Sequence, residues 1–287
     1  MIDSILKGLI ARKVKEVSDL LESVTKNKQI DSILHGPTLS ADCRFSKALK
    51  PKQGLAVIAE IKRRSPSVGM IATIEAPEKL ASVYASGGAA AVSVLTDQAG
   101  FGGSIQDLAR VSGELNRLSV PTLRKDFIFH PVQIAEAKVA GAGAILLIGA
   151  VFNYLREAGF KNTTSLKTML RETQRMGLEA LIEIHSEDEL NMAVDAGAEI
   201  IGINQRNLNS FSLHPELFEK LAFKFPSHVI CVAESGIRSS EDARKVRELG
   251  YHAVLVGEAL VRSKSPETLI RALTSAEVPT HEEIFAV

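Results

Sequence analysis

The stretch VPTLRKDFIFHPVQIAEAKVAGAGAILLIGA (residues 120–150) holds one complete strand–helix–strand unit. Short apolar runs at VPTL (120–123) and AILLIGA (144–150) predict two strands, and the spacing of apolar residues over Val132–Ala140 predicts a helix between them. Gly141-Ala142-Gly143 fits the end of that helix and a short turn into the second strand, because glycine is favoured just after a helix. Strands that are almost wholly apolar are buried on both faces, which indicates a parallel sheet covered by helices.

The same unit recurs on both sides of this stretch. Helical patterns at Pro77–Ser86, Ile105–Leu118 and Glu187–Ala196 alternate with further apolar runs, spaced roughly 20–35 residues apart as expected of βα units rather than hairpins. With the two runs quoted above, these make eight predicted strands. The six additional runs are LAVIAEI (55–61), AAAVSVL (89–95), LEALIEI (178–184), EIIGIN (199–204), HVICVAE (228–234) and HAVLVGE (252–258).

Eight strands with eight following helices are the number that closes a (β/α)8 barrel, so the predicted fold is an α/β TIM barrel. The alternative is an open, doubly wound sheet. Such sheets usually have fewer repeats and often carry a G-x-G-x-x-G fingerprint after the first strand. That fingerprint is absent after residues 55–61, and the barrel is the preferred interpretation.

The chain before the first strand has a different pattern. Apolar residues recur at helical spacing from Ile2 to Val24 with polar residues between them, which predicts an amphipathic helix that needs a partner surface. Gln29–Lys52 contains two prolines and is predicted to be an irregular connector with one helical turn near Phe45–Leu49. We expect residues 1–52 to form an N-terminal helical extension that packs on a catalytic barrel of residues 53–287, the two making one structural domain.

Composition and charge exclude several classes of protein. With 34 basic and 34 acidic residues among 287, a strongly basic nucleic-acid binder and an acidic disordered tail are poor interpretations. Two cysteines, Cys43 and Cys231, indicate a reducing compartment rather than a disulfide framework, and no Cys or His spacing is typical of a metal site. The N-terminus lacks the apolar core of a signal peptide, and the longest apolar stretch (144–152) is shorter than a membrane span of roughly 20 residues. We expect a cytoplasmic protein with no nucleic-acid or membrane partner.

In a barrel of this kind the chemistry lies at the C-terminal ends of the strands. Glu60 and Lys62 end the first run and point to the same side, since side chains alternate along a strand. Lys125 ends the third run and Glu183 the fifth. Glu60 and Glu183 are flanked by isoleucine and would be costly to bury without a cation, for which Lys62 and Lys125 are available. Such a cluster can supply both an acid and a base near neutral pH.

Other strand ends carry further polar groups. The sixth run ends in Asn204-Gln205-Arg206, the seventh in Glu234-Ser235-Gly236 and the eighth in Gly257-Glu258. The positions after the seventh and eighth strands often bind phosphate through backbone N–H groups, and glycine allows close approach. The alternative for any one of these residues is a solvated charge or an ordinary ion pair, and we predict that Arg63, Arg64 and Arg124 are surface charges of this kind.

Seven stretches together resemble one known family. The chain is similar to indole-3-glycerol phosphate synthase over essentially its whole length, including an N-terminal helical extension, and the combination of AEIKRRSPS with LRKDF and GINQRNL is specific. The matching stretches are VIAEIKRRSPSVG (57–69), SVLTDQAGFGGS (93–104), LRKDFIFHPVQIAEAKVAGAGAILLI (123–148), LIEIHSEDEL (181–190), IIGINQRNL (200–208), AESGI (233–237) and AVLVGEAL (253–260).

The resemblance implies an activity in tryptophan biosynthesis. Members of that family convert 1-(2-carboxyphenylamino)-1-deoxyribulose 5-phosphate to indole-3-glycerol phosphate, with release of carbon dioxide and water and with no cofactor or metal. By motif, Lys125 resembles the general acid of ring closure and Glu183 the general base or dehydration partner. Glu60 and Lys62 resemble the remaining catalytic pair, with Lys62 also able to reach the phosphate or the leaving hydroxyl.

The same comparison of motifs implies the remaining site residues and partners. Asn204 and Ser235 match positions that organise the catalytic site, and Glu258 is expected to offer phosphate its backbone N–H with its carboxylate turned away. The only partner implied is the small-molecule substrate, for a monomer or weak homo-oligomer. The substrate-binding residues implied are Ser65, Gly236 and Gly257 for phosphate, Arg206 for substrate contact, and Phe101 and Phe127 for the anthranilate ring.

Three other functions are compatible with a phosphate-binding barrel. A phosphoribosylanthranilate isomerase would need a Cys or Asp acid–base pair, and the first strand here ends in Glu60 and Lys62 instead. A Schiff-base aldolase would need a buried lysine such as Lys125, but the matching motifs do not favour it. A phosphometabolite-binding module without catalysis would be indifferent to Lys125→Ala, whereas a synthase would lose turnover and keep its affinity for substrate.

Overall fold

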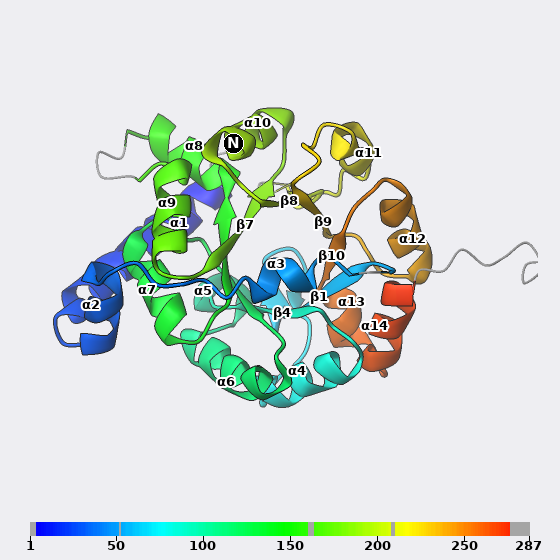
Figure 1. Cartoon of the computed structure of the whole chain (residues 1–287), viewed down its shortest axis with the longest axis horizontal. Helices are drawn as coiled ribbons and strands as arrows, with labels where there is room; N and C mark the ends of the chain where they lie inside the picture. Colours follow the sequence, from blue (N-terminus) through cyan, green and yellow to red (C-terminus); the bar gives the residue numbers. More distant parts are fainter. Residues whose placement is uncertain (1–3, 52, 160–163, 208–209, 276–287) are drawn as a thin grey trace, which may run out of the picture.

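The computed structural model describes residues 4–51, 53–159, 164–207 and 210–275 (Figure 1). Eight parallel strands close into a barrel in the order β1-β10-β9-β8-β7-β6-β5-β4, and helices surround it. The predicted fold class and the position of every predicted strand are confirmed. The barrel strands are β1 (Ala56–Ile61), β4 (Ala91–Leu95), β5 (Thr122–Lys125), β6 (Ala144–Ile148), β7 (Glu179–Ile184), β8 (Ile200–Asn204), β9 (Ile230–Glu234) and β10 (Ala253–Val256).

Helices follow the strands as the periodicity predicts. Several begin at a serine whose hydroxyl accepts a hydrogen bond from the backbone three residues on, as Ser104, Ser186 and Ser239 do. A small antiparallel hairpin of β2 (Arg64–Ser65) and β3 (Gly69–Met70) follows β1. The outer helices are α4 (Pro77–Ser86), α5 (Gln98–Phe101), α6 (Ile105–Leu115), η1 (Asn116–Leu118), α7 (Pro131–Val139), α8 (Gly149–Glu157), α9 (Leu166–Arg175), α10 (Glu187–Ala196), α11 (Glu216–Ala222), α12 (Ser240–Glu248), α13 (Glu258–Arg262) and α14 (Pro266–Ser275).

The core is mostly aliphatic, because aromatic residues make up only 5% of the chain. Every residue of β1, β4, β6, β9 and β10 is buried, which agrees with strands covered on both faces. Cys231 lies among them, and burial raises the pKa of its thiol to about 12, so it packs as a small apolar side chain. No helix in the described part of the chain is both long and apolar enough to cross a membrane.

Three helices precede the barrel: α1 (Ser4–Val24), α2 (Lys28–His35) and α3 (Arg44–Ala48). They are blue in Figure 1. Ile2, where the predicted amphipathic helix begins, lies outside the described residues. Both α1 and α2 pack against α7. The carboxylate of Glu179, the first residue of β7, accepts hydrogen bonds from the backbone N–H groups of Phe45 and Ser46 in α3, so α3 covers the N-terminal end of the barrel.

The prediction of an irregular connector over Gln29–Lys52 was wrong in its first part, because α2 occupies residues 28–35. Asn27 caps that helix, its side-chain oxygen accepting from the N–H groups of Gln29 and Ile30. Ile30 is buried, and Ile33 and Leu34 pack beside the core at helical spacing. The cap and this spacing were the local signal for a helix.

Candidate active site

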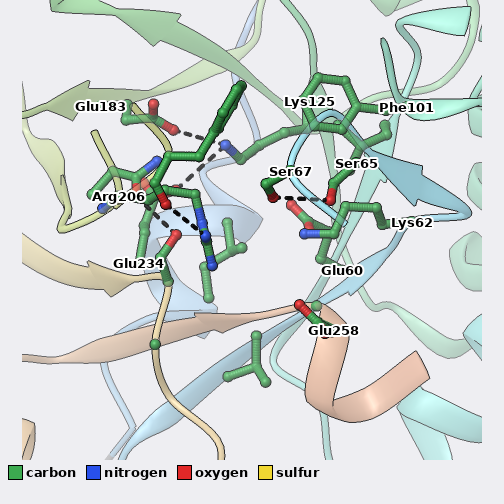
Figure 2. A pocket seen from close by; sticks show the side chains of 18 of the residues that line it. Glu60, Lys62, Ser65, Ser67, Phe101, Lys125, Glu183, Arg206, Glu234 and Glu258 are labelled. Atoms are coloured by element: carbon green, nitrogen blue, oxygen red, sulfur yellow. Dashed lines mark hydrogen bonds and ion pairs between the residues drawn. The ribbon is translucent and has the colours of Figure 1, made fainter. Parts of the chain in front are cut away.

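A cavity of about 520 Å³ lies at the C-terminal ends of the barrel strands (Figure 2). Its size is that of a site for a small organic ligand. The walls are formed by the ends of several strands and by the loops that follow them, although these segments are far apart in the sequence. All twelve residues that the sequence nominates line this one cavity: Glu60, Lys62, Ser65, Phe101, Lys125, Phe127, Glu183, Asn204, Arg206, Ser235, Gly236 and Gly257.

The floor of the cavity is a layer of charged side chains. Glu60, Lys125, Glu183 and Glu234 come from β1, β5, β7 and β9, which are the first, third, fifth and seventh strands of the barrel. One side chain from each alternate strand is how a (β/α)8 barrel fills a layer. Here the uppermost layer holds three carboxylates and one ammonium group in place of aliphatic side chains.

Lys125 lies between two of these carboxylates. Its Nζ is 2.7 Å from Oε2 of Glu183 and 3.4 Å from Oε2 of Glu234 (Figure 2). Burial alone would lower the pKa of Lys125, but Glu183, Glu234 and Glu60 outweigh it and raise that pKa above its usual value. Lys125 is therefore a positively charged proton donor that faces the cavity.

The two carboxylates beside Lys125 differ in protonation. Burial acts to raise the pKa of Glu183, but the charges of Lys125 and His185 hold it at about 2. Burial and the nearby charge of Glu183 raise the pKa of Glu234 to about 8, more than Lys125 lowers it. Neither oxygen of Glu234 receives an N–H or O–H hydrogen bond from the described residues. At neutral pH the site thus holds an ionised and a protonated carboxyl group side by side.

Glu234 stands at a strand end in the sequence but was not among the nominated site residues. The signal for it was the same as for Glu60 and Glu183: a carboxylate that ends an almost wholly apolar strand. A second signal lies in Gly202 of β8, since a Cβ there would collide with the Glu234 carboxylate. Glycine at that point of a buried strand makes room for the charged layer.

Glu60 of the charged layer also pairs with Lys62, which lies nearer the rim. Their charged groups are 2.7 Å apart, and Lys62 is the more exposed of the two. Gly257, at the end of β10, lies against this pair: a Cβ there would collide with Oε1 of Glu60 and lie 3.2 Å from Nζ of Lys62. The absence of a side chain at Gly257 therefore leaves room for the ion pair as well as for a ligand.

Asn204 and Ser235 are joined across the ends of β8 and β9. The Ser235 hydroxyl donates to Oδ1 of Asn204 at 2.8 Å, and the backbone N–H of Arg206 donates to the same oxygen at 3.0 Å. Ser235 has a φ of 67°, in the left-handed region that favours glycine. The buried Gln205, which sequence reasoning passed over, holds this turn by donating from Nε2 to the Ser235 carbonyl at 2.8 Å.

Two phenylalanines provide the apolar wall. Phe101 ends the short helix α5, and Phe127 follows β5 two residues after Lys125. Ser65 lies in strand β2, which packs against α5, and its hydroxyl is 3.3 Å from that of Ser67. The carboxylate of Glu258, which also borders the cavity in Figure 2, accepts a hydrogen bond from Arg262 at 3.0 Å.

The assignment of Arg124 to the surface was wrong. Lys125 points into the barrel, so its neighbour Arg124 points outward between the barrel and α7, where it is buried. There its guanidinium donates to the Gln133 carbonyl at 2.7 Å and pairs with Glu136 at 2.8 Å. Arg63 is likewise only partly exposed, being paired with Asp107 at 2.6 Å, whereas Arg64 is exposed as predicted.

The charged layer is not organised as a metal site. Within the residues that the structure describes, no group of three or more His, Cys, Asp and Glu side chains is arranged to hold a metal ion. What the arrangement offers is an ammonium donor, an ionised and a protonated carboxyl group, and an apolar wall beside them.

Comparison with known proteins agrees with this geometry. A family model described as indole-3-glycerol phosphate synthase matches residues 6–273. The chain is 47% identical over 225 residues to indole-3-glycerol phosphate synthase of a Nocardioides species, covering 78% of this chain and 82% of the relative. It is 41% identical to the protein of that name from Opitutus terrae, covering 91% of this chain and 95% of the relative.

Among solved structures, thiamine phosphate pyrophosphorylase from Pyrococcus furiosus matches with a TM-score of 0.56 and 14% identity, over 77% of this chain and 94% of that one. A likeness at this identity concerns the barrel fold alone. The family model goes further, because residues 6–273 include most of the extension and the whole barrel with its strand ends. The chain belongs to the indole-3-glycerol phosphate synthase family.

Proposed function

We propose that this chain performs its family's reaction, the synthesis of indole-3-glycerol phosphate in tryptophan biosynthesis, with Lys125 as the central acid. The substrate is 1-(2-carboxyphenylamino)-1-deoxyribulose 5-phosphate. The observation that carries the proposal is the Lys125 ammonium, held by Glu183 at 2.7 Å and facing a cavity with one apolar wall. An acid fixed beside an apolar surface suits ring closure between an aromatic ring and a ketone.

Ring closure is the step for Lys125. The aromatic carbon that bears the carboxylate attacks the ketose carbonyl, a carbon–carbon bond forms, and the carbonyl oxygen takes the Lys125 proton to become a hydroxyl. Developing alkoxide charge is more basic than an amine, so this transfer is downhill even for a lysine whose pKa is raised. The buried carboxylates keep the ammonium oriented before the substrate arrives, which lowers the cost of reorganisation.

Loss of carbon dioxide and water completes the reaction. The carboxylate leaves as carbon dioxide, and its bonding electrons restore the aromatic ring. The new hydroxyl then leaves as water after protonation, while a base removes a proton from the adjacent carbon to form the indole double bond. Glu183, ionised at neutral pH, is the base in this scheme, and Lys62, oriented by Glu60 at 2.7 Å, is the acid.

Substrate binding falls to the remaining residues of the cavity. Ser65, Gly236 and Gly257 would contact phosphate, with backbone N–H groups available at the two glycines. Arg206, Asn204 and Ser235 would order the sugar chain between the two ends. Phe101 and Phe127 would enclose the anthranilate ring. Binding energy from the phosphate then orients the reacting ends.

A direct assay tests the proposal. Metal-free purified protein is incubated with the carboxyphenylamino-deoxyribulose phosphate, and indole fluorescence of the product is followed. The chain contains no tryptophan, so its own emission is weak. We expect a steady rise with the unmodified chain and a rate at least about 100-fold lower with Glu183→Gln, the loss typical of a general base. Equal, negligible signals from both proteins would contradict the proposal, and a binding-only role would remain.

A further inference from the structure

Lys13 of helix α1 is a lysine that the reaction scheme does not use. It is buried, with a side chain only 3% exposed, and its Nζ lies 2.9 Å from Oδ1 of Asp97 and 2.9 Å from Oδ1 of Asp126. Glu16, on the same helix and half exposed, is a third partner at 2.6 Å. Removing an ammonium from water is costly, so a lysine is retained in such a place only where its partners are well placed.

Asp126 connects Lys13 to the catalytic lysine. It follows Lys125 directly, and its Oδ1 also accepts a hydrogen bond from the backbone N–H of Phe127 at 2.8 Å. Its Oδ2 accepts from the Thr96 hydroxyl at 2.6 Å. Lys13 thus holds, through Asp126, the segment that carries both Lys125 and Phe127.

Asp97 connects Lys13 to Phe101, the other phenylalanine of the apolar wall. It caps α5, with Oδ2 accepting from the Gly100 N–H at 2.7 Å, and Phe101 is the last residue of that helix. Asp97 is itself buried. One ammonium group therefore joins α1, the end of β4 and the end of β5, which are distant in sequence.

We infer that Lys13 is a positioning residue for the synthase reaction: it fixes Lys125 and Phe127 through Asp126, and Phe101 through Asp97. The inference rests on the proposed function. It also gives the N-terminal extension a role in the site, since α1 supplies the ammonium that both loops share. A misplacement of about 1 Å in a catalytic group costs about 100-fold in rate, so the loss of this anchor is measurable.

Lys13 and Asp126 are both ionised at neutral pH. Burial lowers the pKa of Lys13, but Asp126, Asp97 and Glu16 raise it above its usual value overall. Burial acts to raise the pKa of Asp126, but the charges of Lys13 and Arg124 outweigh burial and lower that pKa below its usual value. The contact between Lys13 and Asp126 is thus one between full charges, and such contacts are shorter and stronger than neutral hydrogen bonds.

The competing role is a purely structural anchor that holds α1 on the barrel. The two roles differ in what a folded variant does. A structural anchor changes the melting temperature and leaves the turnover of folded protein as it was. A positioning residue lowers kcat at a temperature where the variant is fully folded, while the affinity for phosphate changes little.

The test compares Lys13→Met with Lys15→Met, which removes an exposed lysine from the same helix. We expect Lys13→Met to lower kcat about 100-fold with little change in the affinity for inorganic phosphate, while Lys15→Met matches the unmodified chain. Lys13→Arg, which keeps the charge, should restore part of the rate. Unaltered kcat and KM in folded Lys13→Met, with only a lower melting temperature, would overturn the inference.

Milder substitutions keep the test decisive if Lys13→Met does not fold. Asp126→Asn weakens the branch to Lys125 and should lower kcat, whereas Asp97→Asn weakens the branch to Phe101 and should mainly raise KM. Normal kcat and KM in both folded variants would also overturn the inference. Lack of turnover by the unmodified chain, in contrast, is a failure of the proposed function and is recognised before any variant is compared.

Discussion

Two lysine–glutamate clusters lie in one cavity and differ in how far they are removed from water. Lys125 is within 3.4 Å of two carboxylates, both almost wholly buried. Lys62 has one such partner, Glu60, and lies at the rim where β1 leads into the β2–β3 hairpin. Charge interactions are stronger where water is excluded. The charges of the inner cluster therefore interact more strongly, and the outer pair is somewhat more open to water.

The largest expected effect comes from the inner lysine. Lys125→Met keeps most of the side-chain volume and removes the acid, and we expect kcat to fall by about 10⁴-fold, the upper end for a general acid. Affinity for substrate should be largely kept, because the residues proposed to bind phosphate lie elsewhere in the cavity. Single-turnover and steady-state rates measure both quantities. A change confined to KM would contradict the role given to Lys125.

Removal of the outer lysine should cost less. Lys62→Met is expected to lower kcat by about 100-fold, the lower end of the same range, because water reaches this pair and replaces part of its function. The rate of this variant should also depend less on salt concentration than that of the unmodified chain. If Lys62→Met were more damaging than Lys125→Met, the distinction between the two clusters would be wrong.

The protonated carboxyl of the inner cluster gives stability a pH dependence. Because the folded-state pKa of Glu234 is raised to about 8 from 4.5, the folded chain binds more protons than the unfolded chain between these values. Stability from this group is full below pH 4.5 and is lost as the pH rises toward 8, by about 2 kcal/mol between pH 5 and pH 7.

Glu234→Gln keeps the neutral form and should remove that slope from urea unfolding measured at several pH values. The matched control is Glu219→Gln, which removes an exposed carboxylate from α11. The opposite sign is expected for Glu183, whose folded-state pKa is lowered to about 2: its contribution is full above pH 4.5 and is lost as the pH falls toward 2. If Glu234→Gln kept the pH dependence of unfolding free energy that the unmodified chain has, the titrating proton would belong to another group.

The smallest effect is expected from a single methyl group. Gly202→Ala places a Cβ against the Glu234 carboxylate, whose end can shift, so we expect a loss of about 1 kcal/mol in unfolding free energy, at the lower end for overpacking. Gly113→Ala on α6 meets nothing within 4 Å and should instead stabilise by up to about 1 kcal/mol. Thermal unfolding of the two variants distinguishes these outcomes. If Gly202→Ala and Gly113→Ala changed the unfolding free energy equally, the charged layer around Glu234 would have room for a methyl group.

The predictions from sequence were right where the signal is local. Each barrel strand is a short apolar run, so the eight runs identify the barrel without any long-range information. Glu60, Lys125 and Glu183 were found because a charge that ends such a run is conspicuous. Arg124 was misassigned, because one residue of strand register decides whether a side chain faces the cavity or a helix.

Other parts of the site depend on contacts between distant segments. Lys13 stands in the apolar stripe of α1, between Ile10 and Val17, which signals burial, but only the docking of α1 shows that its partners are Asp97 and Asp126. Gln205 stands beside two nominated residues, yet its hold on the Ser235 carbonyl depends on the pairing of β8 with β9.

The sequence by itself determined the barrel, the helical start of the chain and which chemical groups stand at the strand ends, because these depend on periodicity and on the cost of placing charge in apolar runs. Only the tertiary structure decided which charges meet. Closing the sheet brings alternate strands together in one layer, so that Lys125 has two carboxylates and Lys62 one. Protonation follows from those distances and from burial, and neither is a property of a single stretch of chain.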